Sequence, residues 1–238
     1  MPEAGLSGLE LPHRPRALLW DMDGTLLDSE RHWDVALRDL ARYLGGSLTD
    51  SIRAQMVGAS TAMSIGLLFT DLGLRPDPRA SAEAHSWLLE RTGELFDEGL
   101  TWRPGAEAAL DLVGAAGLPM ALVTNTSRAL TERALGTLGR ERFTASVCGD
   151  EVQRGKPEPE PYLRAAELLG VAVEHCLTIE DSPTGASAAG AAGCPVLVVP
   201  CEVTVPERAG RVFRRSLEGL TLAELTGAWH AGTTAMGQ

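Results

Sequence analysis

The chain has 238 residues, 44% of them apolar, and a formal net charge of −11. This length allows one large domain or a core with a smaller inserted domain. The acidic balance argues against a nucleic-acid partner, which would need positive charge over a broad face. The sequence contains no run of about 18 uncharged apolar residues, so we expect neither a membrane-spanning helix nor a membrane partner.

The two ends of the chain are expected to lie outside the packed structure. Residues 1–16 mix Gly, Pro, acidic and basic residues, which predicts a flexible lead-in and not a signal peptide. Residues 227–238 are rich in small side chains, and we expect a C-terminal tail that frays after Trp229.

The four cysteines form no C-x-x-C pair, and no histidine stands near them at zinc spacing. They are therefore expected to be buried free thiols in a reducing cytosol, which indicates a cytoplasmic location. The sequence leaves the oligomeric state open, with a monomer slightly favoured.

Apolar runs and helical patterns alternate along most of the chain. Strands are predicted at residues 17–20, 120–123, 176–179 and 195–199, with a short fifth strand at 147–148. Helices are predicted at residues 106–116, 128–138, 159–169 and 184–192. This alternation predicts an α/β fold with a doubly wound, Rossmann-like parallel sheet, formed by residues 17–28 and 103–226.

Residues 29–102 break the alternation because they contain no convincing strand. Four helical patterns follow one another at residues 34–44, 52–57, 63–72 and 82–96. We expect an inserted helical domain that leaves the core after the first strand and returns near residue 103.

Polar residues stand at the ends of three predicted strands. Asp21 follows the first strand, Thr124 the second, and Glu180 with Asp181 the third. Each acid alone could be a helix cap or a turn former. Ligands of such sheets bind at the carboxyl ends of the strands, so the three strand ends together predict a site.

Four carboxylates could meet in this site. Asp21 and Asp23 lie two residues apart on a turn that Gly24 allows to bend. Such acids repel each other unless a cation neutralises them or one of them holds a proton. With Asp181 and Glu180 they form a set of hard oxygen ligands without histidine or thiolate, which predicts Mg²⁺ and not zinc.

Three further groups could hold a phosphate. Thr124 can donate its hydroxyl, Asn125 its backbone amide and Lys156 its ammonium group. Phosphoryl transfer depends mainly on such positioning and on neutralising charge. A loop lysine is often only a solvated surface charge, but Gly155 and Pro157 flank this one and stiffen its position.

Four short motifs in order resemble one known family. They are D-M-D-G-T-L at residues 21–26, V-T-N at 123–125, G-K-P-E-P-E-P at 155–161 and I-E-D-S-P-T-G at 179–185. From about residue 17 to 225 the sequence resembles the haloacid dehalogenase (HAD) superfamily, and within it the β-phosphoglucomutase-like phosphatases. The helical insert resembles the mobile cap of that family.

The resemblance implies a role for each motif residue. Asp21 would attack phosphorus and become an aspartyl-phosphate, while Asp23 would protonate the leaving oxygen and later deprotonate water. Asp21, Asp181 and the backbone carbonyl of Asp23 would bind Mg²⁺, with Glu180 as a further ligand or a supporting residue. The phosphate would be held by the three polar residues named above: Thr124, Asn125 and Lys156.

The cap residues that would meet the substrate are harder to assign. Glu30, Trp33 and Arg53 are candidates, although Trp33 could be a core aromatic of the cap and Arg53 a solvated helix charge. A mutase of this family carries a histidine where this chain has Trp33. It also carries an arginine after a Val-Gly pair, which residues 57–61 lack.

The sequence therefore predicts a Mg²⁺-dependent phosphomonoester hydrolase that acts on a small phosphorylated metabolite such as a sugar phosphate. One alternative is a phosphosugar mutase of the β-phosphoglucomutase type. Another, from a different class, is a signalling module that is phosphorylated on aspartate without being a catalyst. The chain length, the helical insert and the D-x-D-G-T turn argue against the signalling module.

Overall fold

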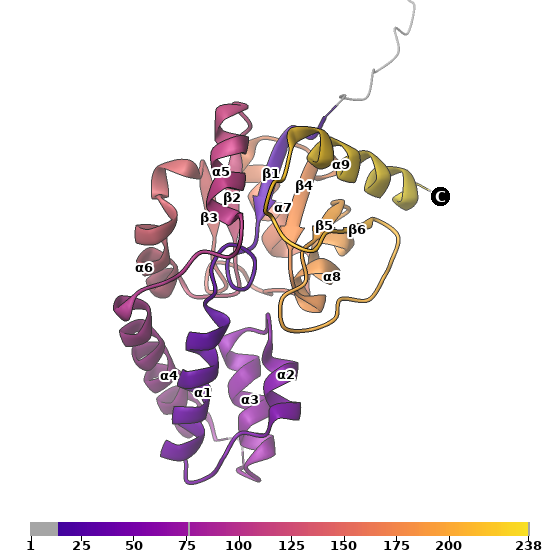
Figure 1. Ribbon diagram of the computed structural model, residues 1–238. Helices are drawn as coiled ribbons and strands as arrows, with labels where there is room; N and C mark the ends of the chain where they lie inside the picture. Colours follow the sequence, from indigo (N-terminus) through magenta and orange to yellow (C-terminus); the bar gives the residue numbers. More distant parts are fainter. Residues whose placement is uncertain (1–13, 76, 238) are drawn as a thin grey trace, which may run out of the picture.

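The structure is a computed structural model that describes residues 14–75 and 77–237 (Figure 1). Its core is a six-stranded sheet with the order β3-β2-β1-β4-β5-β6, and all five strand pairs are parallel. The strands are β1 (Ala17–Trp20), β2 (Met120–Val123), β3 (Ala145–Val147), β4 (Cys176–Glu180), β5 (Val196–Val198) and β6 (Arg211–Phe213). The predicted doubly wound α/β fold is confirmed.

The edges of the sheet differ from expectation. β3 begins two residues before the predicted strand at 147–148, and β6 was not predicted at all. Both strands have only three residues, and β6 pairs with a single neighbour and remains partly exposed. A short edge strand needs no continuous apolar run, so its sequence carries little signal.

Helices cover both faces of the sheet, and β1 is therefore buried on both sides. Leu18 and Trp20 belong to one apolar cluster, and Ala17 and Leu19 belong to the other. The first cluster includes α5 (Ala106–Ala115), α6 (Arg128–Leu138) and α9 (Leu222–Met236), and the second includes α7 (Glu160–Leu169) and α8 (Pro183–Ala191).

The end of the chain is helical, which corrects the expectation of a frayed tail after Trp229. Helix α9 continues to Met236. Trp229 is 2% exposed in the core, and its indole donates a hydrogen bond to the carbonyl of Glu174 at 3.0 Å. Gly232 lies so close to Pro195 that an added Cβ would be 2.7 Å from the proline Cβ. Small residues here permit close packing on the sheet.

Four further helices lie beyond the end of β1 (Figure 1). They are α1 (Glu30–Tyr43), α2 (Asp50–Met56), α3 (Thr61–Asp71) and α4 (Pro78–Glu98). Their buried side chains, among them Leu40, Leu68 and Leu88, form a third apolar cluster. We call these helices the four-helix unit.

The two segments that join the four-helix unit to the sheet run side by side. Leu27 forms an antiparallel bridge with Trp102, and the Asp28 amide donates to the Thr101 carbonyl at 2.9 Å. The backbone therefore leaves and re-enters the core at one place.

Three further expectations concern the N-terminal lead-in, membrane-spanning helices and the cysteines. Residues 1–13 of the predicted lead-in lie outside the described residues. Among the residues described, no helix combines the length and the apolar character needed to cross a bilayer. All four cysteines are free; three are buried, and Cys201 is partly exposed.

Candidate active site

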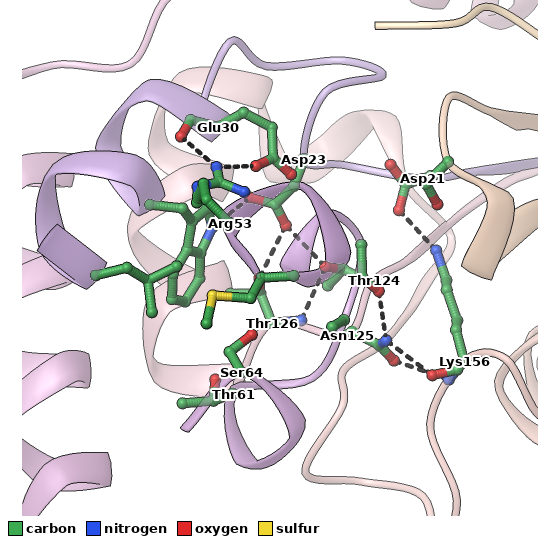
Figure 2. A pocket seen from close by; sticks show the side chains of 16 residues that line it. Asp21, Asp23, Glu30, Arg53, Thr61, Ser64, Thr124, Asn125, Thr126 and Lys156 are labelled. Atoms are coloured by element: carbon green, nitrogen blue, oxygen red, sulfur yellow. Dashed lines mark hydrogen bonds and ion pairs between the residues drawn. The ribbon is translucent and has the colours of Figure 1, made fainter. Parts of the chain in front are cut away.

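The order of the strands brings the predicted site residues together. β1 lies between β2 and β4, and Trp20 is level with Leu122 on one side and Ile179 on the other. The next residues along the chain therefore meet at one edge of the sheet. A pocket at this edge is lined from the core by Asp21, Asp23, Thr124, Asn125, Thr126, Lys156 and Ser182 (Figure 2).

Lys156 lies at the centre of the charged groups. Its Nζ is 2.6 Å from Asp21 Oδ1 and 2.7 Å from Glu180 Oε1, and it donates to the carbonyl of Val123 at 2.8 Å. The lysine is 4% exposed, which contradicts a solvated surface charge. Burial alone would lower the pKa of Lys156, but the two carboxylates outweigh it and raise that pKa.

Both carboxylate oxygens of Glu180 are occupied by the protein. Oε1 accepts hydrogen bonds from Lys156 Nζ and from the Tyr162 hydroxyl, both at 2.7 Å. Oε2 accepts from the amides of Asp181 and Ser182 and from the Ser182 hydroxyl, at 3.1 to 3.2 Å. Of the two roles anticipated for Glu180, this geometry favours the supporting role over direct metal binding.

A cation fits between the acids at the strand ends. One oxygen each of Asp21, Asp181 and Glu180 lie within 4.8 Å of one another. Asp21 Oδ2 and Asp181 Oδ2 are buried and lack hydrogen-bond partners. Burial, followed by neighbouring acids, raises the pKa of both aspartates well above the usual range, so their ionised forms need a counter-charge. Buried, unpaired carboxylate oxygens are the donor set that a hard divalent cation requires.

The turn after β1 depends on Gly24. Its φ is +83°, and an added Cβ would lie 2.2 Å from Asp181 Oδ2. A side chain there would strain the backbone and collide with a candidate metal ligand. The same turn aligns Thr25, whose hydroxyl donates to Asp181 Oδ1 at 3.4 Å.

Asp23 is held from both sides of the pocket. Its Oδ1 accepts from the Ser29 hydroxyl at 2.6 Å and from the Trp33 indole at 3.1 Å. Its Oδ2 accepts from the hydroxyls of Thr124 at 3.1 Å and Thr126 at 2.8 Å. Trp33, a candidate substrate residue from the sequence, thus contacts Asp23 directly while it also packs against the apolar core.

The side chain of Asn125 forms hydrogen bonds to other parts of the protein. Its oxygen accepts from the Lys156 amide at 2.8 Å, and its nitrogen donates to the carbonyls of Lys156 and Gly58 at 3.1 and 2.9 Å. The backbone amide, which the sequence assigned to phosphate binding, is a separate group. The side chain positions the loop that carries Lys156.

The four-helix unit forms the other side of the pocket, where Glu30 and Arg53 are paired (Figure 2). Arg53 Nη2 is 2.7 Å from Glu30 Oε2 and donates to the Glu30 carbonyl at 3.1 Å. Arg53 is 6% exposed, so the expectation of a solvated helix charge is wrong. The guanidinium lies near the carboxylates of Glu30, Asp34 and Glu202, which are described below.

Sequence reasoning missed several residues of the site. Thr126 and Ser29 hold Asp23, and Tyr162 holds Glu180. Thr126 could have been found from its place two residues after Thr124 on the same strand end. The Tyr162 hydroxyl could not, because its contact depends on how α7 packs against β4.

The chain matches the haloacid dehalogenase-like hydrolase family over residues 15–193, which is most of its length. It belongs to this family. The matched range contains all four motifs singled out in the sequence, as well as the helices inserted after the first of them.

Several curated relatives are named as phosphatases. The chain is 33% identical over 205 residues to hexitol phosphatase A of Escherichia coli K12, covering 81% of this chain and 87% of the relative. It is 32% identical over 179 residues to a phosphorylated carbohydrates phosphatase of Thermotoga maritima, covering 74% and 81% respectively. This chain is accordingly a HAD-type phosphatase.

Solved structures share the fold. CbbY from Rhodobacter sphaeroides, crystallised with phosphate, matches with a TM-score of 0.79 at 29% identity and covers 89% of this chain and 99% of its own. A β-phosphoglucomutase from Clostridium difficile reaches the same TM-score at 20% identity, covering 91% and 97%. At that identity the likeness concerns the fold alone.

Proposed function

We propose that this phosphatase hydrolyses phosphomonoesters of small, sugar-like metabolites with Mg²⁺ and through an aspartyl-phosphate on Asp21. One observation carries the proposal. Asp21 stands at the tip of the central strand with Oδ1 on the Lys156 ammonium and Oδ2 buried without a partner. The names of the relatives, a hexitol phosphatase and a carbohydrate phosphate phosphatase, support the substrate class.

The residues divide the reaction between them. A carboxylate oxygen of Asp21 attacks phosphorus, and the bond to the leaving oxygen breaks as the aspartyl-phosphate forms. Asp23 gives its proton to the leaving oxygen. It then takes a proton from the water that attacks phosphorus and frees Asp21. Inorganic phosphate leaves in that second step.

Charge on the phosphoryl group is met by fixed donors. Lys156 supplies a positive charge, and the backbone amide of Asn125 supplies a hydrogen bond. The Thr124 hydroxyl donates to Asp23 in this structure and would supply a second hydrogen bond after turning toward the phosphoryl group. Mg²⁺ held by Asp21, Asp181 and the Asp23 carbonyl would supply further positive charge and relieve the repulsion among the acids. Glu180 keeps Lys156 and the Asp181–Ser182 turn in place.

We further propose that residues 29–102 act as a cap over a core of residues 17–28 and 103–226. The pocket is lined from both parts, and the joining segments are paired at one place. Such paired linkers permit a hinge motion while the third apolar cluster keeps the cap rigid. Closure would exclude bulk water while the ester transfers its phosphoryl group to Asp21.

A panel of phosphate esters tests the proposed function. Purified protein is incubated with p-nitrophenyl phosphate and with sugar and alditol phosphates, with Mg²⁺ or with a chelator, and released phosphate is measured. We expect turnover that needs the metal and that falls by about 10⁴-fold or more in Asp21→Asn, in which the nucleophile is gone. No turnover above the variant on any ester would contradict the proposal.

The same protein separates the two alternatives. A phosphosugar mutase primed with a bisphosphate would interconvert hexose 1- and 6-phosphates without net phosphate release. A signalling module would keep an acyl-phosphate on Asp21 for minutes, whereas a phosphatase loses the label within its turnover time.

A further inference from the structure

The pocket contains only two cationic residues among the described residues that line it, Lys156 and Arg53. Lys156 lies on the core side, next to the proposed nucleophile. Arg53 extends from α2 on the opposite side, where the organic part of a substrate would lie. Whether Arg53 is available to an anion therefore decides which leaving groups this side accepts.

Arg53 is already surrounded by acids. Besides the 2.7 Å contact with Glu30, its Nε lies 3.3 Å from Asp34 Oδ1, and its Nη2 lies 3.8 Å from Glu202 Oε2. Asp34 comes from α1 and Glu202 from the loop after β5. Asp34 is shared with Arg38, whose Nε lies 3.0 Å from both Asp34 oxygens. The charge of Arg53 is therefore offset by Glu30 and, in part, by Asp34 and Glu202, which leaves no unpaired cation on this side among the described residues that line the pocket.

The three acids differ in their access to the pocket. Glu30 is 3% exposed and lines the pocket, whereas Asp34 and Glu202 do not line it and lie against a separate surface groove. Arg53 lines both the pocket and the groove. Asp34 and Glu202 therefore neutralise Arg53 from behind without touching a ligand in the pocket.

The remaining groups on this side are uncharged. Thr61 and Ser64 offer hydroxyls, and Leu37, Met56 and Trp33 offer apolar surface. Hydroxyl groups of a ligand can pair with Glu30 and with these side chains, while its C–H surfaces pack on the apolar ones. A carboxylate or second phosphate would find no unpaired cation among the described residues that line this side of the pocket.

Resting on the proposed function, we propose that the leaving group is an uncharged, hydroxyl-bearing carbon skeleton such as a sugar or an alditol. Esters that carry a second anionic group, either a carboxylate or another phosphate, are hydrolysed with a lower kcat/KM. The reason is that Asp34 and Glu202 help to offset the charge of Arg53, so the second anion finds no unpaired cation. Selectivity thus comes from residues behind the pocket wall as well as from its surface.

Matched esters test the selectivity. Values of kcat/KM are measured with Mg²⁺ for glucitol 6-phosphate, 2-phosphoglycolate and fructose 1,6-bisphosphate. We expect the uncharged skeleton to be preferred by roughly tenfold or more, because the second anionic group of the other two esters would lose hydration without gaining an unpaired cation. Equal or better use of either anionic ester overturns this inference alone, whereas no turnover of any ester, p-nitrophenyl phosphate included, overturns the proposed function as well.

Two variants test the cause. Glu202→Gln and Asp34→Asn each release part of the Arg53 charge. Each should raise kcat/KM for the anionic esters relative to glucitol 6-phosphate by about three- to fivefold, the size of a partly exposed ion pair. Glu207→Gln is the matched control, because Glu207 is exposed in the same loop and has no ion pair with Arg53.

The outcome of the variants is decisive in either direction. Turnover of glucitol 6-phosphate should stay unchanged, since neither residue lines the pocket. An unchanged ratio in both variants, with the fold intact by circular dichroism, would show that Arg53 does not set the selectivity.

Discussion

Two buried cations stand on opposite sides of one pocket, and carboxylates surround both. Lys156 on the core side has Asp21 and Glu180 at 2.6 and 2.7 Å. Arg53, on the side of the four-helix unit that we propose to be a cap, has Glu30 at 2.7 Å, with Asp34 and Glu202 further away. The core group leaves two buried aspartate oxygens without partners, whereas each acid near Arg53 lies within 3.8 Å of the arginine and Asp34 is also paired with Arg38.

This difference indicates different tasks. Unpaired buried carboxylates are costly unless a ligand completes the site, so the core group is built to receive a cation and a phosphoryl group. The cap group is neutralised from within the protein and shapes the electrostatic field around the leaving group. Asp23 connects the two sides, with one oxygen held by Ser29 and Trp33 and the other by Thr124 and Thr126.

After the loss of the nucleophile itself, the largest effect is expected where the two sides meet. Asp23→Asn keeps the shape of the side chain but cannot shuttle a proton, so kcat should fall by about 10²–10⁴-fold. The measurement is steady-state phosphate release with saturating Mg²⁺. Asp50→Asn, at a fully exposed position of the cap, is the control, and full activity of Asp23→Asn would remove Asp23 from proton transfer.

Removing each cation in turn compares the two sides directly. Lys156→Met leaves two buried acids unpaired, and the loss of such a partner costs about 3–5 kcal/mol of unfolding free energy. It should also lower kcat/KM by far more than Arg53→Met does, because only Lys156 faces the phosphoryl group. Urea unfolding and kinetics measure the two losses, and equal kinetic effects of both variants would contradict the division of tasks.

The Glu30–Arg53 pair should make the free energy of unfolding depend on pH. Burial, opposed by Arg53, raises the pKa of Glu30 to about 7 from its model-peptide value of 4.5. Between about pH 4.5 and 7 the folded protein therefore holds a proton on Glu30 that the unfolded chain has lost, and this contribution to stability disappears as the pH rises through that range. The decrease should be about 3 kcal/mol at most, given ~1.36 kcal/mol per pKa unit.

Glu30→Gln removes this contribution and should flatten the stability curve across that range. Unfolding free energies of wild type and variant are measured by urea titration at several pH values, and their difference is plotted. Glu83→Gln, at an exposed position of α4, serves as the control. A pH-independent difference between wild type and Glu30→Gln would contradict the shift.

The smallest effect concerns the support of the core site. Tyr162→Phe removes the hydroxyl that donates to Glu180 but keeps the ring, which lies 5.0 Å from Lys156 Nζ. Glu180 retains its other four donors, so stability should fall by about 0.5–1.5 kcal/mol and kcat by less than in Lys156→Met. A loss in kcat as large as that of Lys156→Met would give the hydroxyl a direct part in the chemistry. Tyr43→Phe, on the exposed cap surface, is the comparison.

Local patterns in the sequence were sufficient for the α/β fold and for the residues at the strand ends. An apolar run followed by Asp21, Thr124 or Asp181 predicts both a buried strand and the group at its tip, because parallel strands end at one edge. The prediction failed where burial comes from distant packing. β6 has too few residues to show a pattern, and the small residues after Trp229 favour close packing as much as fraying.

Tertiary structure alone decided which charges are buried and which partners they have. Asp21 and Lys156 are 135 residues apart, and Glu30 and Arg53 are 23 apart, so no local pattern reports their distances. The motifs determined which residues gather at the pocket. Packing determined that Glu180 is fully hydrogen-bonded and that Arg53 is enclosed, because desolvation and ion pairing depend on every element that surrounds a charge.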